Sequence, residues 1–177
     1  MKGGKQCVYR GQVVVLELET VALPNGSRLR MESVRHPGGA AVVARDGQGR
    51  VCVLRQYRPV LQDWVWELPA GKIEAGEPPL ETAQRELAEE AGVVAASWRE
   101  LGEIVSSPGV FDECIHLFLA DSLAEADSSH VDEHEVFERH WLPFEQLLQW
   151  ARDGRLQDAK SIVALWRAAE YLPGKDR

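Results

Sequence analysis

The sequence has little cysteine, a deficit of basic charge and no long hydrophobic run. Its three cysteines, Cys7, Cys52 and Cys114, are odd in number and show no CxxC spacing, which argues against a disulfide framework. No apolar run approaches the ~20 residues of a membrane span, and the N-terminus has no apolar core typical of a secretory signal. These absences predict a soluble cytoplasmic protein with reduced thiols.

The charge balance is acidic. The chain has 20 Lys and Arg against 28 Asp and Glu, which gives a net charge of −8 and a pI of about 5.2. Binding to nucleic acid or to an anionic membrane by bulk electrostatics is therefore not expected, and an anionic ligand must be bound locally. With 177 residues, 45% hydrophobic and 27% charged, the composition is typical of one compact globular domain.

Strand patterns dominate the first 60 residues, and helices follow. Residues on both sides of Pro24-Asn25-Gly26 predict a hairpin, and an amphipathic pattern before Gly92 predicts a helix of about three turns. This combination of strands and helices indicates an α/β protein. The remaining expected elements are strands at 40–44, 50–57, 101–106 and 114–120, a long acidic loop at 121–135, a helix ending near Gly154 and a last helix capped by Asp158.

The segment from Gly71 to Val93 contains the residues best suited to chemistry. Glu86, Glu89 and Glu90 stand at i, i+3 and i+4, so like charges meet on one helical face at a cost of a few tenths of a kcal/mol per pair. A hard divalent cation such as Mg²⁺ would compensate, because it prefers oxygen ligands. Arg85 and Glu77 are placed to hold the carboxylates, and the alternative is a solvated acidic face.

This segment resembles the Nudix box, G-x5-E-x7-R-E-U-x-E-E-x-G-U with U aliphatic, and matches it at every fixed position. The resemblance implies an α/β/α sandwich with a mixed sheet and hydrolysis of a nucleoside diphosphate linked to another group. It also implies Mg²⁺ as cofactor, with Mn²⁺ as a possibility. The implied metal ligands are Glu86, Glu90, Glu89 and the carbonyl of Ala70, with Arg85 orienting the glutamates.

Features outside the box resemble the ADP-ribose pyrophosphatase branch of the Nudix family. They are Pro108 in a Ser-Pro-Gly loop, the run from Trp66 to Gly71 preceded by Arg55-Gln56-Tyr57-Arg58, and the C-terminal segment 153–160. This branch implies hydrolysis of ADP-ribose to AMP and ribose 5-phosphate. Other ADP-sugars, NADH and dinucleoside polyphosphates are alternative substrates, and a ligand sensor without catalysis is a less favoured one. The implied substrate-binding residues are Arg55, Arg58, Arg35, Glu67, Trp66 and Pro108.

Each of these residues also has a simpler interpretation. Arg55 and Arg58 suit a diphosphate because Arg makes bidentate contacts with phosphate, and one contact is more expected than two. Surface charge is the alternative. One of Trp64 and Trp66 is expected in the core rather than at a ligand. No partner can be named for His116 from the sequence.

An acidic loop and the N-terminal residues complete the predictions. The branch carries a catalytic base in such a loop, which makes Glu133 the expected base and Glu135 a metal ligand or alternate base, although an acidic loop without function has the same spacing. Residues 1–35 are expected to form a separate β segment that makes a homodimer, as in this branch. Residues 36–177 then form the Nudix domain.

Overall fold

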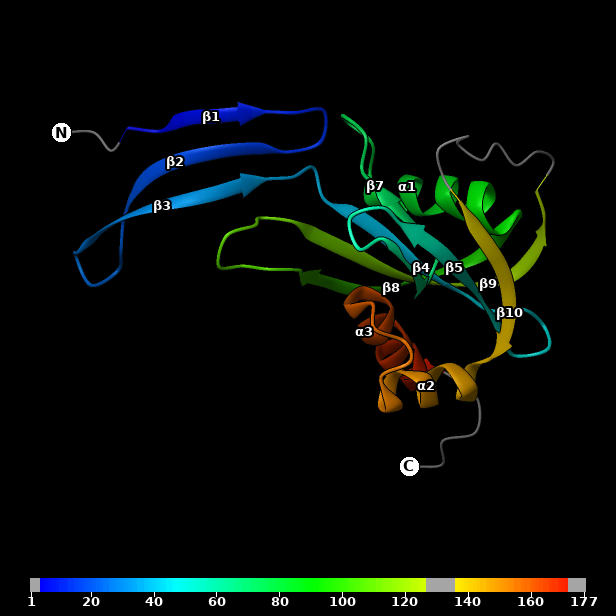
Figure 1. The fold of residues 1–177 in the computed structure, drawn as a ribbon. Helices are drawn as coiled ribbons and strands as arrows, with labels where there is room; N and C mark the ends of the chain where they lie inside the picture. Colours follow the sequence, from blue (N-terminus) through cyan, green and yellow to red (C-terminus); the bar gives the residue numbers. More distant parts are fainter. Residues whose placement is uncertain (1–3, 127–135, 172–177) are drawn as a thin grey trace.

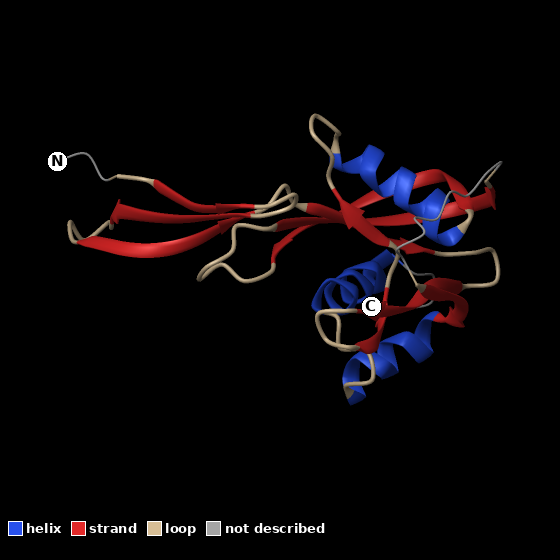
Figure 2. Ribbon diagram, turned by 45° about the horizontal axis from the view of Figure 1, so that its top comes forward, coloured by secondary structure: helices blue, strands red, loops and turns tan. Residues whose placement is uncertain are grey.

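The computed structural model describes residues 4–126 and 136–171. Its N-terminal part is an antiparallel sheet of β1 (Gln6–Arg10), β2 (Val15–Ala22) and β3 (Arg28–Arg35), in that order. The predicted hairpin corresponds to β2 and β3, whose turn places Gly26 at φ +85°. The sheet extends away from the rest of the molecule as an arm (Figure 2).

The body of the described structure contains two further sheets. The first has the order β7-β4-β9-β8, in which β4 and β9 are parallel and the other pairs antiparallel, so the sheet is mixed as predicted. The second has the order β10-β5-β6 and is antiparallel. The strands are β4 (Gly39–Ala44), β5 (Arg50–Arg58), β6 (Asp63–Glu67), β7 (Ala70–Lys72), β8 (Val93–Val105), β9 (Cys114–Glu125) and β10 (Phe137–Pro143).

Helices cover the mixed sheet on both sides (Figure 1). On one face, α1 (Pro79–Glu86) continues into the π-helical turn η1 (Leu87–Ala91). The other face packs against α2 (Phe144–Asp153) and α3 (Ala159–Ala168), which is followed by the 3₁₀ turn η2 (Ala169–Tyr171). All of β4 is buried because its side chains alternate between two hydrophobic clusters, one under α1 and one under α2 and α3. The predicted α/β class is confirmed.

The predicted helix ends are confirmed, whereas two strand boundaries are wrong. Gly92 and Gly154 end their helices at positive φ, and the Asp158 side chain accepts a hydrogen bond from the Ser161 amide at 3.1 Å. However, β8 begins at Val93 rather than at 101, and β9 continues to Glu125 into the expected loop. Backbone pairing holds this long hairpin together although many of its side chains are polar and exposed.

β10 is a strand that the sequence pattern does not predict. It contains no β-branched residue, and the polar run Glu138, Arg139 and His140 interrupts its apolar residues. It forms because its backbone pairs with β5 over seven residues, from Gln56 to Arg50. Among the described residues, no helix combines the length and apolar character needed to cross a lipid bilayer.

Candidate active site

The side chain of Arg85 organises the acidic residues of α1 and η1. Its Nη1 donates to Glu86 Oε1 at 2.6 Å and to Glu89 Oε2 at 3.2 Å. Its Nε and Nη2 donate to the two carboxylate oxygens of Glu77 at 3.0 and 3.1 Å. These bonds, that to Glu77 foremost, raise the pKa of Arg85, so the guanidinium remains charged. One cation therefore holds three carboxylates in fixed positions.

Glu77 connects the loop before α1 to the helix itself. Besides Arg85, its Oε2 accepts hydrogen bonds from the Thr82 hydroxyl at 2.7 Å and from the Glu74 amide at 3.1 Å. The hydrogen bond from Arg85 is the main cause that lowers the pKa of Glu77 to about 2. Glu77 is thus a permanent anion that fixes Arg85 rather than a group that exchanges protons near neutral pH.

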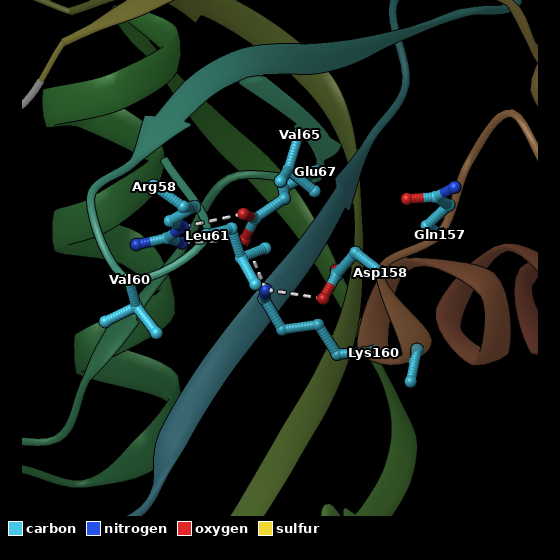
Figure 3. A pocket seen from close by; sticks show the side chains of 9 residues that line it. Arg58, Val60, Leu61, Val65, Glu67, Gln157, Asp158 and Lys160 are labelled. Carbon is cyan, nitrogen blue, oxygen red and sulfur yellow. Dashed lines mark hydrogen bonds and ion pairs between the residues drawn. The ribbon is translucent and has the colours of Figure 1, made fainter. Parts of the chain in front are cut away.

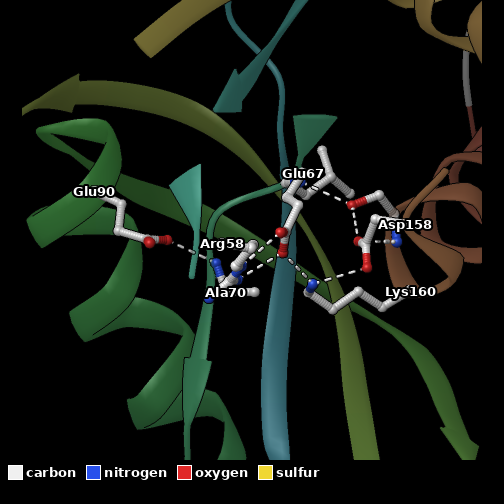
Figure 4. Close-up of polar contacts among 8 residues, drawn as sticks. Arg58, Glu67, Ala70, Glu90, Asp158 and Lys160 are labelled. Atoms are coloured by element: carbon white, nitrogen blue, oxygen red, sulfur yellow. Dashed lines mark hydrogen bonds and ion pairs between the residues drawn. The ribbon is translucent and has the colours of Figure 1, made fainter. Parts of the chain in front are cut away.

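Two of the predicted metal ligands are buried carboxyl groups. Glu90 is 2% exposed and Glu86 is 8% exposed. The Ala70 amide donates to Glu90 Oε2 at 2.7 Å, which links the helix to β7 (Figure 4). Glu89 is less buried. Carboxylates gathered at a buried position need positive charge, and a set of oxygen donors of this kind fits a hard divalent cation.

The backbone of Gly71 makes room for the Glu86 carboxylate. A Cβ atom at Gly71 would overlap the Glu86 carboxyl group and also approach its Cγ at 2.7 Å. Glu86 cannot easily move aside, because its Oε1 is held by Arg85. Glycine is therefore required here for close approach of a side chain, not for a turn.

We expect the substitution Gly71→Ala to lower kcat about 100-fold, because displacing a catalytic group by about 1 Å has an effect of this size. The measurement is the steady-state rate of the diphosphate hydrolysis that the resemblance to the Nudix box implies, with saturating divalent cation. Gly47→Ala is the matched control, since a Cβ there meets nothing within 4 Å. Wild-type activity in the Gly71→Ala enzyme would contradict the need for Glu86 at this position.

A chain of charged groups extends from the acidic site to α3 (Figure 4). Arg58 donates to both carboxylate oxygens of Glu67 at 2.7 Å, and Lys160 Nζ lies 2.6 Å from Glu67 Oε2 and 3.0 Å from Asp158 Oδ1. Ser161 Oγ donates to Asp158 Oδ2 and accepts from the Leu68 amide at 2.8 Å. The start of α3 is thereby fastened to the segment that leads into the box.

The charge states of this chain follow from its geometry. Burial by itself would raise the pKa of Glu67, but the hydrogen bonds from Arg58 and the charge of Lys160 outweigh it and lower the pKa to about 2. Burial would lower the pKa of Lys160, but the charges of Asp158 and Glu67 raise it. Arg58, Glu67 and Lys160 are therefore ionised at neutral pH.

A cavity of about 560 Å³ opens beside this chain of charges (Figure 3). Arg58, Glu67 and Lys160 line its polar side, and the exposed side chains of Val60 and Leu61 line the loop that borders it. The cavity lies next to the acidic site, because Ala70, whose amide donates to Glu90, follows Glu67 by only three residues. A cavity of this size and mixed character can hold part of a small-molecule ligand.

Arg55 and Arg58 lie on opposite faces of β5. Arg55 is paired with Trp66, whereas Arg58 is three residues further along the strand and so points to the other face. The Arg55 guanidinium lies 5.2 Å from the Trp64 ring and 3.5 Å from Glu138 Oε2, away from Glu67. The structure thus brings Arg58 to the acidic site and does not bring Arg55 there.

Trp66 packs toward the hydrophobic core. Its ring centroid lies 5.0 Å from that of Trp150 in α2 and 5.0 Å from that of His140 in β10. The side chain joins the cluster under α2 and α3 as a partly buried member. Of the two tryptophans in β6, Trp66 is therefore the one in the core, on the opposite face from Glu67.

Arg35 and Pro108 lie at the junction of the arm and the body. Arg35 donates to Glu17 Oε2 at 2.8 Å, to Glu19 and to Asp112 Oδ2 at 3.2 Å. The loop that contains Pro108 is joined to β3 by the hydrogen bond from the Val34 amide to the Val110 carbonyl at 2.7 Å. The structure assigns Arg35 to contacts within its own chain, between the arm and this loop.

Sequence reasoning missed two cations of the site. Lys160 lies in the C-terminal segment that resembles the branch, but its distance from Glu67 along the chain hides their contact. Arg139 in β10 donates to the Glu90 carbonyl at 2.6 Å, and the sequence pattern does not predict β10. Glu133 and Glu135, the predicted base and its neighbour, lie outside the described residues.

Comparisons with known proteins find relatives that match most of the chain. The family model for the NUDIX domain matches residues 35–165. The chain is 38% identical over 159 residues to the methanol dehydrogenase activator of Bacillus methanolicus, which covers 89% of this chain and 86% of that protein. It is 37% identical over 173 residues to the ADP-ribose pyrophosphatase of Bacillus subtilis, covering 97% of this chain and 91% of that protein.

The fold is also found among solved structures. A crystal structure of an ADP compounds hydrolase matches with a TM-score of 0.82 and 24% identity, covering 100% of this chain and 97% of that one. At this identity the similarity establishes the fold. Since the family model spans most of the chain and includes Glu77, Arg85, Glu86, Glu89 and Glu90, the protein belongs to the Nudix family.

Proposed function

We propose that this Nudix pyrophosphohydrolase cleaves the diphosphate of ADP-ribose to give AMP and ribose 5-phosphate, with Mg²⁺ as cofactor. The observation that carries the proposal is the set of carboxylates held by Arg85 beside a cavity lined by Arg58 and Lys160. An acidic site with bound cations can accept a diphosphate, and the adjacent cavity has room for an attached sugar.

Two relatives support this substrate. The Bacillus subtilis protein that matches nearly the whole chain is an ADP-ribose pyrophosphatase. A second protein of that name, from Mycobacterium tuberculosis, is 32% identical over 162 residues and covers 90% of this chain and 78% of its own. Both matches extend well beyond the box, so they include the residues around the cavity.

The residues divide into metal-holding and positioning groups. Glu86, Glu89 and Glu90, with the carbonyl of Ala70, would hold the cation. When bound, Mg²⁺ or Mn²⁺ neutralises diphosphate charge and lowers the pKa of a coordinated water. Arg85 fixes the orientation of the Glu86 and Glu89 carboxylates through its hydrogen bonds to them.

Substrate contacts and proton transfer fall to other groups. We assign diphosphate binding to Arg58 rather than Arg55. Arg58 lies on the same face of the β5–β6 pair as Glu67, and the negative charge of Glu90 helps to raise its pKa. Glu67 holds Arg58 in place, and Pro108 shapes the loop next to β3. Glu133 would take the proton from the attacking water, with Glu135 as a metal ligand or alternate base.

A substrate panel tests the proposal. Purified protein with Mg²⁺ is given ADP-ribose, ADP-glucose, NADH, diadenosine polyphosphates and dGTP, and the products are separated by chromatography. We expect ADP-ribose to be the best substrate and to yield AMP and ribose 5-phosphate. If another compound is hydrolysed best, the proposed substrate is wrong and the assignment as a hydrolase stands. If folded protein hydrolyses none of the compounds, the chain is instead a ligand sensor.

We also propose that the arm pairs with a second copy of the chain. Among its described residues, only Glu17 and Ser33 are buried, and both are polar, so the arm has no hydrophobic core of its own. Apolar side chains lie on both faces of the sheet, Leu18 on one and Leu29 on the other. A small sheet of this kind needs a packing partner for stability.

Sedimentation equilibrium tests the dimer. The wild-type protein is expected at twice the 19.8 kDa chain mass. The double substitution Leu18→Asp/Leu29→Asp should give the monomer mass, because a charge on each face opposes burial. Val94→Asp in β8 is the control, since Val94 is 46% exposed and Leu29 is 45% exposed. A wild-type monomer, or a dimer that survives the double substitution, would refute the assignment.

A further inference from the structure

Three side chains with metal-binding chemistry meet on β8 and β9, outside the acidic site. Glu103 lies opposite His116 in the strand pairing, and Cys114 is two residues before His116 on the same face. Their ligand atoms all lie within 4.8 Å of one another. The Cys114 thiol donates to Glu103 Oε2 at 3.3 Å, and His116 Nδ1 lies 3.9 Å from the same oxygen.

This cluster is on the α1 face of the mixed sheet, beyond the first turn of that helix. Phe118, on the same face of β9, packs in the cluster with Ala83 and Leu87 of α1. A cavity of about 500 Å³ lies in front of Glu103 and His116 and is bordered by residues 78–80. The site is separate from the acidic site because Gly71, which contacts Glu86, is on β7 at the opposite edge of the sheet.

We propose that Glu103, Cys114 and His116 form a binding site for Zn²⁺. A thiolate, an imidazole and a carboxylate are the ligand types that Zn²⁺ accepts, whereas Mg²⁺ prefers oxygen alone. Three protein ligands leave a fourth tetrahedral position for water, and water can reach it through the adjoining cavity. On binding, the thiol proton passes to solvent and the sulfur becomes a metal ligand.

The position of the site predicts its effect on the protein. Glu103 precedes the loop with Pro108 on β8, and Cys114 is the first residue after it on β9. An ion bound by residues of both strands would cross-link them at the base of that loop. The loop itself is hydrogen-bonded to β3, where the Asp112 amide donates to the Val34 carbonyl. Zn²⁺ should therefore raise the unfolding temperature by binding the folded chain.

Titration with Co²⁺ as a spectroscopic substitute for Zn²⁺ tests the site, with excess Mg²⁺ present to occupy the acidic residues of the box. We expect a thiolate-to-cobalt charge-transfer band that Zn²⁺ abolishes by displacement. The substitution Cys114→Ser should remove the band, and His116→Asn should weaken binding at least about tenfold, because even loss of a group that only supports a ligand has that effect. Circular dichroism reports whether each variant is folded.

Cys7→Ser is the matched control, because Cys7 is an exposed thiol on β1. It should keep the band and the rise in unfolding temperature with Zn²⁺. Absence of a band in wild-type protein, its persistence in Cys114→Ser or its loss in Cys7→Ser would each overturn the proposal. No substrate is used, so the result is independent of the proposed hydrolysis.

Discussion

Replacing Glu90 by Gln is expected to lower kcat about 10³-fold, which corresponds to about 4 kcal/mol of transition-state stabilisation. The physical reason is the loss of a buried anionic ligand, since Glu90 is 2% exposed and fixed by the Ala70 amide. The Gln side chain keeps an oxygen that can accept this bond, so the fold should survive. The measurement is ADP-ribose turnover with Mg²⁺, together with thermal unfolding.

Glu81→Gln is the control for this substitution. Glu81 is an exposed carboxyl group in the first turn of α1, so the change removes the same charge from the same helix. Its activity should equal that of the wild type. A Glu90→Gln enzyme with full activity would show that the metal is held elsewhere, and a Glu81→Gln enzyme with an equal loss would indicate a general effect of helix charge.

Replacing Glu67 by Gln is expected to have the largest effect on stability. Glu67 ties Arg58 and Lys160 together in a buried position, and its pKa is lowered from 4.5 to about 2. This difference corresponds to about 3 kcal/mol of unfolding free energy at neutral pH. For a chain of this length the unfolding temperature should fall by about 6 to 12 °C.

The pH dependence has a definite sign. Because the pKa of Glu67 is lower in the folded protein, the carboxylate stabilises the fold above pH 4.5 and loses this contribution as the pH falls toward 2. The wild-type and Glu67→Gln proteins should therefore converge in stability over that range. Asp63→Asn, an exposed carboxyl group on the same strand, is the control and should leave the curve of the wild type unchanged. A constant difference between wild-type and Glu67→Gln proteins at every pH would contradict this account.

The elements that the sequence predicts well are those with strong local signals. Gly92 and Gly154 end helices because glycine readily adopts the left-handed backbone conformation, and Asp158 begins one because its side chain caps the helix. Both signals depend only on residues that are close in sequence. The spacing of Glu86, Glu89 and Glu90 likewise places them together, since they are close in sequence. The π-helical turn η1 within this spacing is not predicted, because its hydrogen bonds differ from those of an ordinary helix without a change in residue pattern.

The sequence by itself determined the α/β class, the Nudix box and the grouping of Glu77 with Arg85, since these depend on local order. Only the tertiary structure decided that Arg58 and not Arg55 faces Glu67, because strand alternation depends on which residues pair across β5 and β6. It also joined Lys160 to Glu67, and Cys114 and His116 to Glu103. Contacts of this kind join residues from different elements, which are brought together by the pairing of β8 with β9 and by the packing of α3 against the sheets.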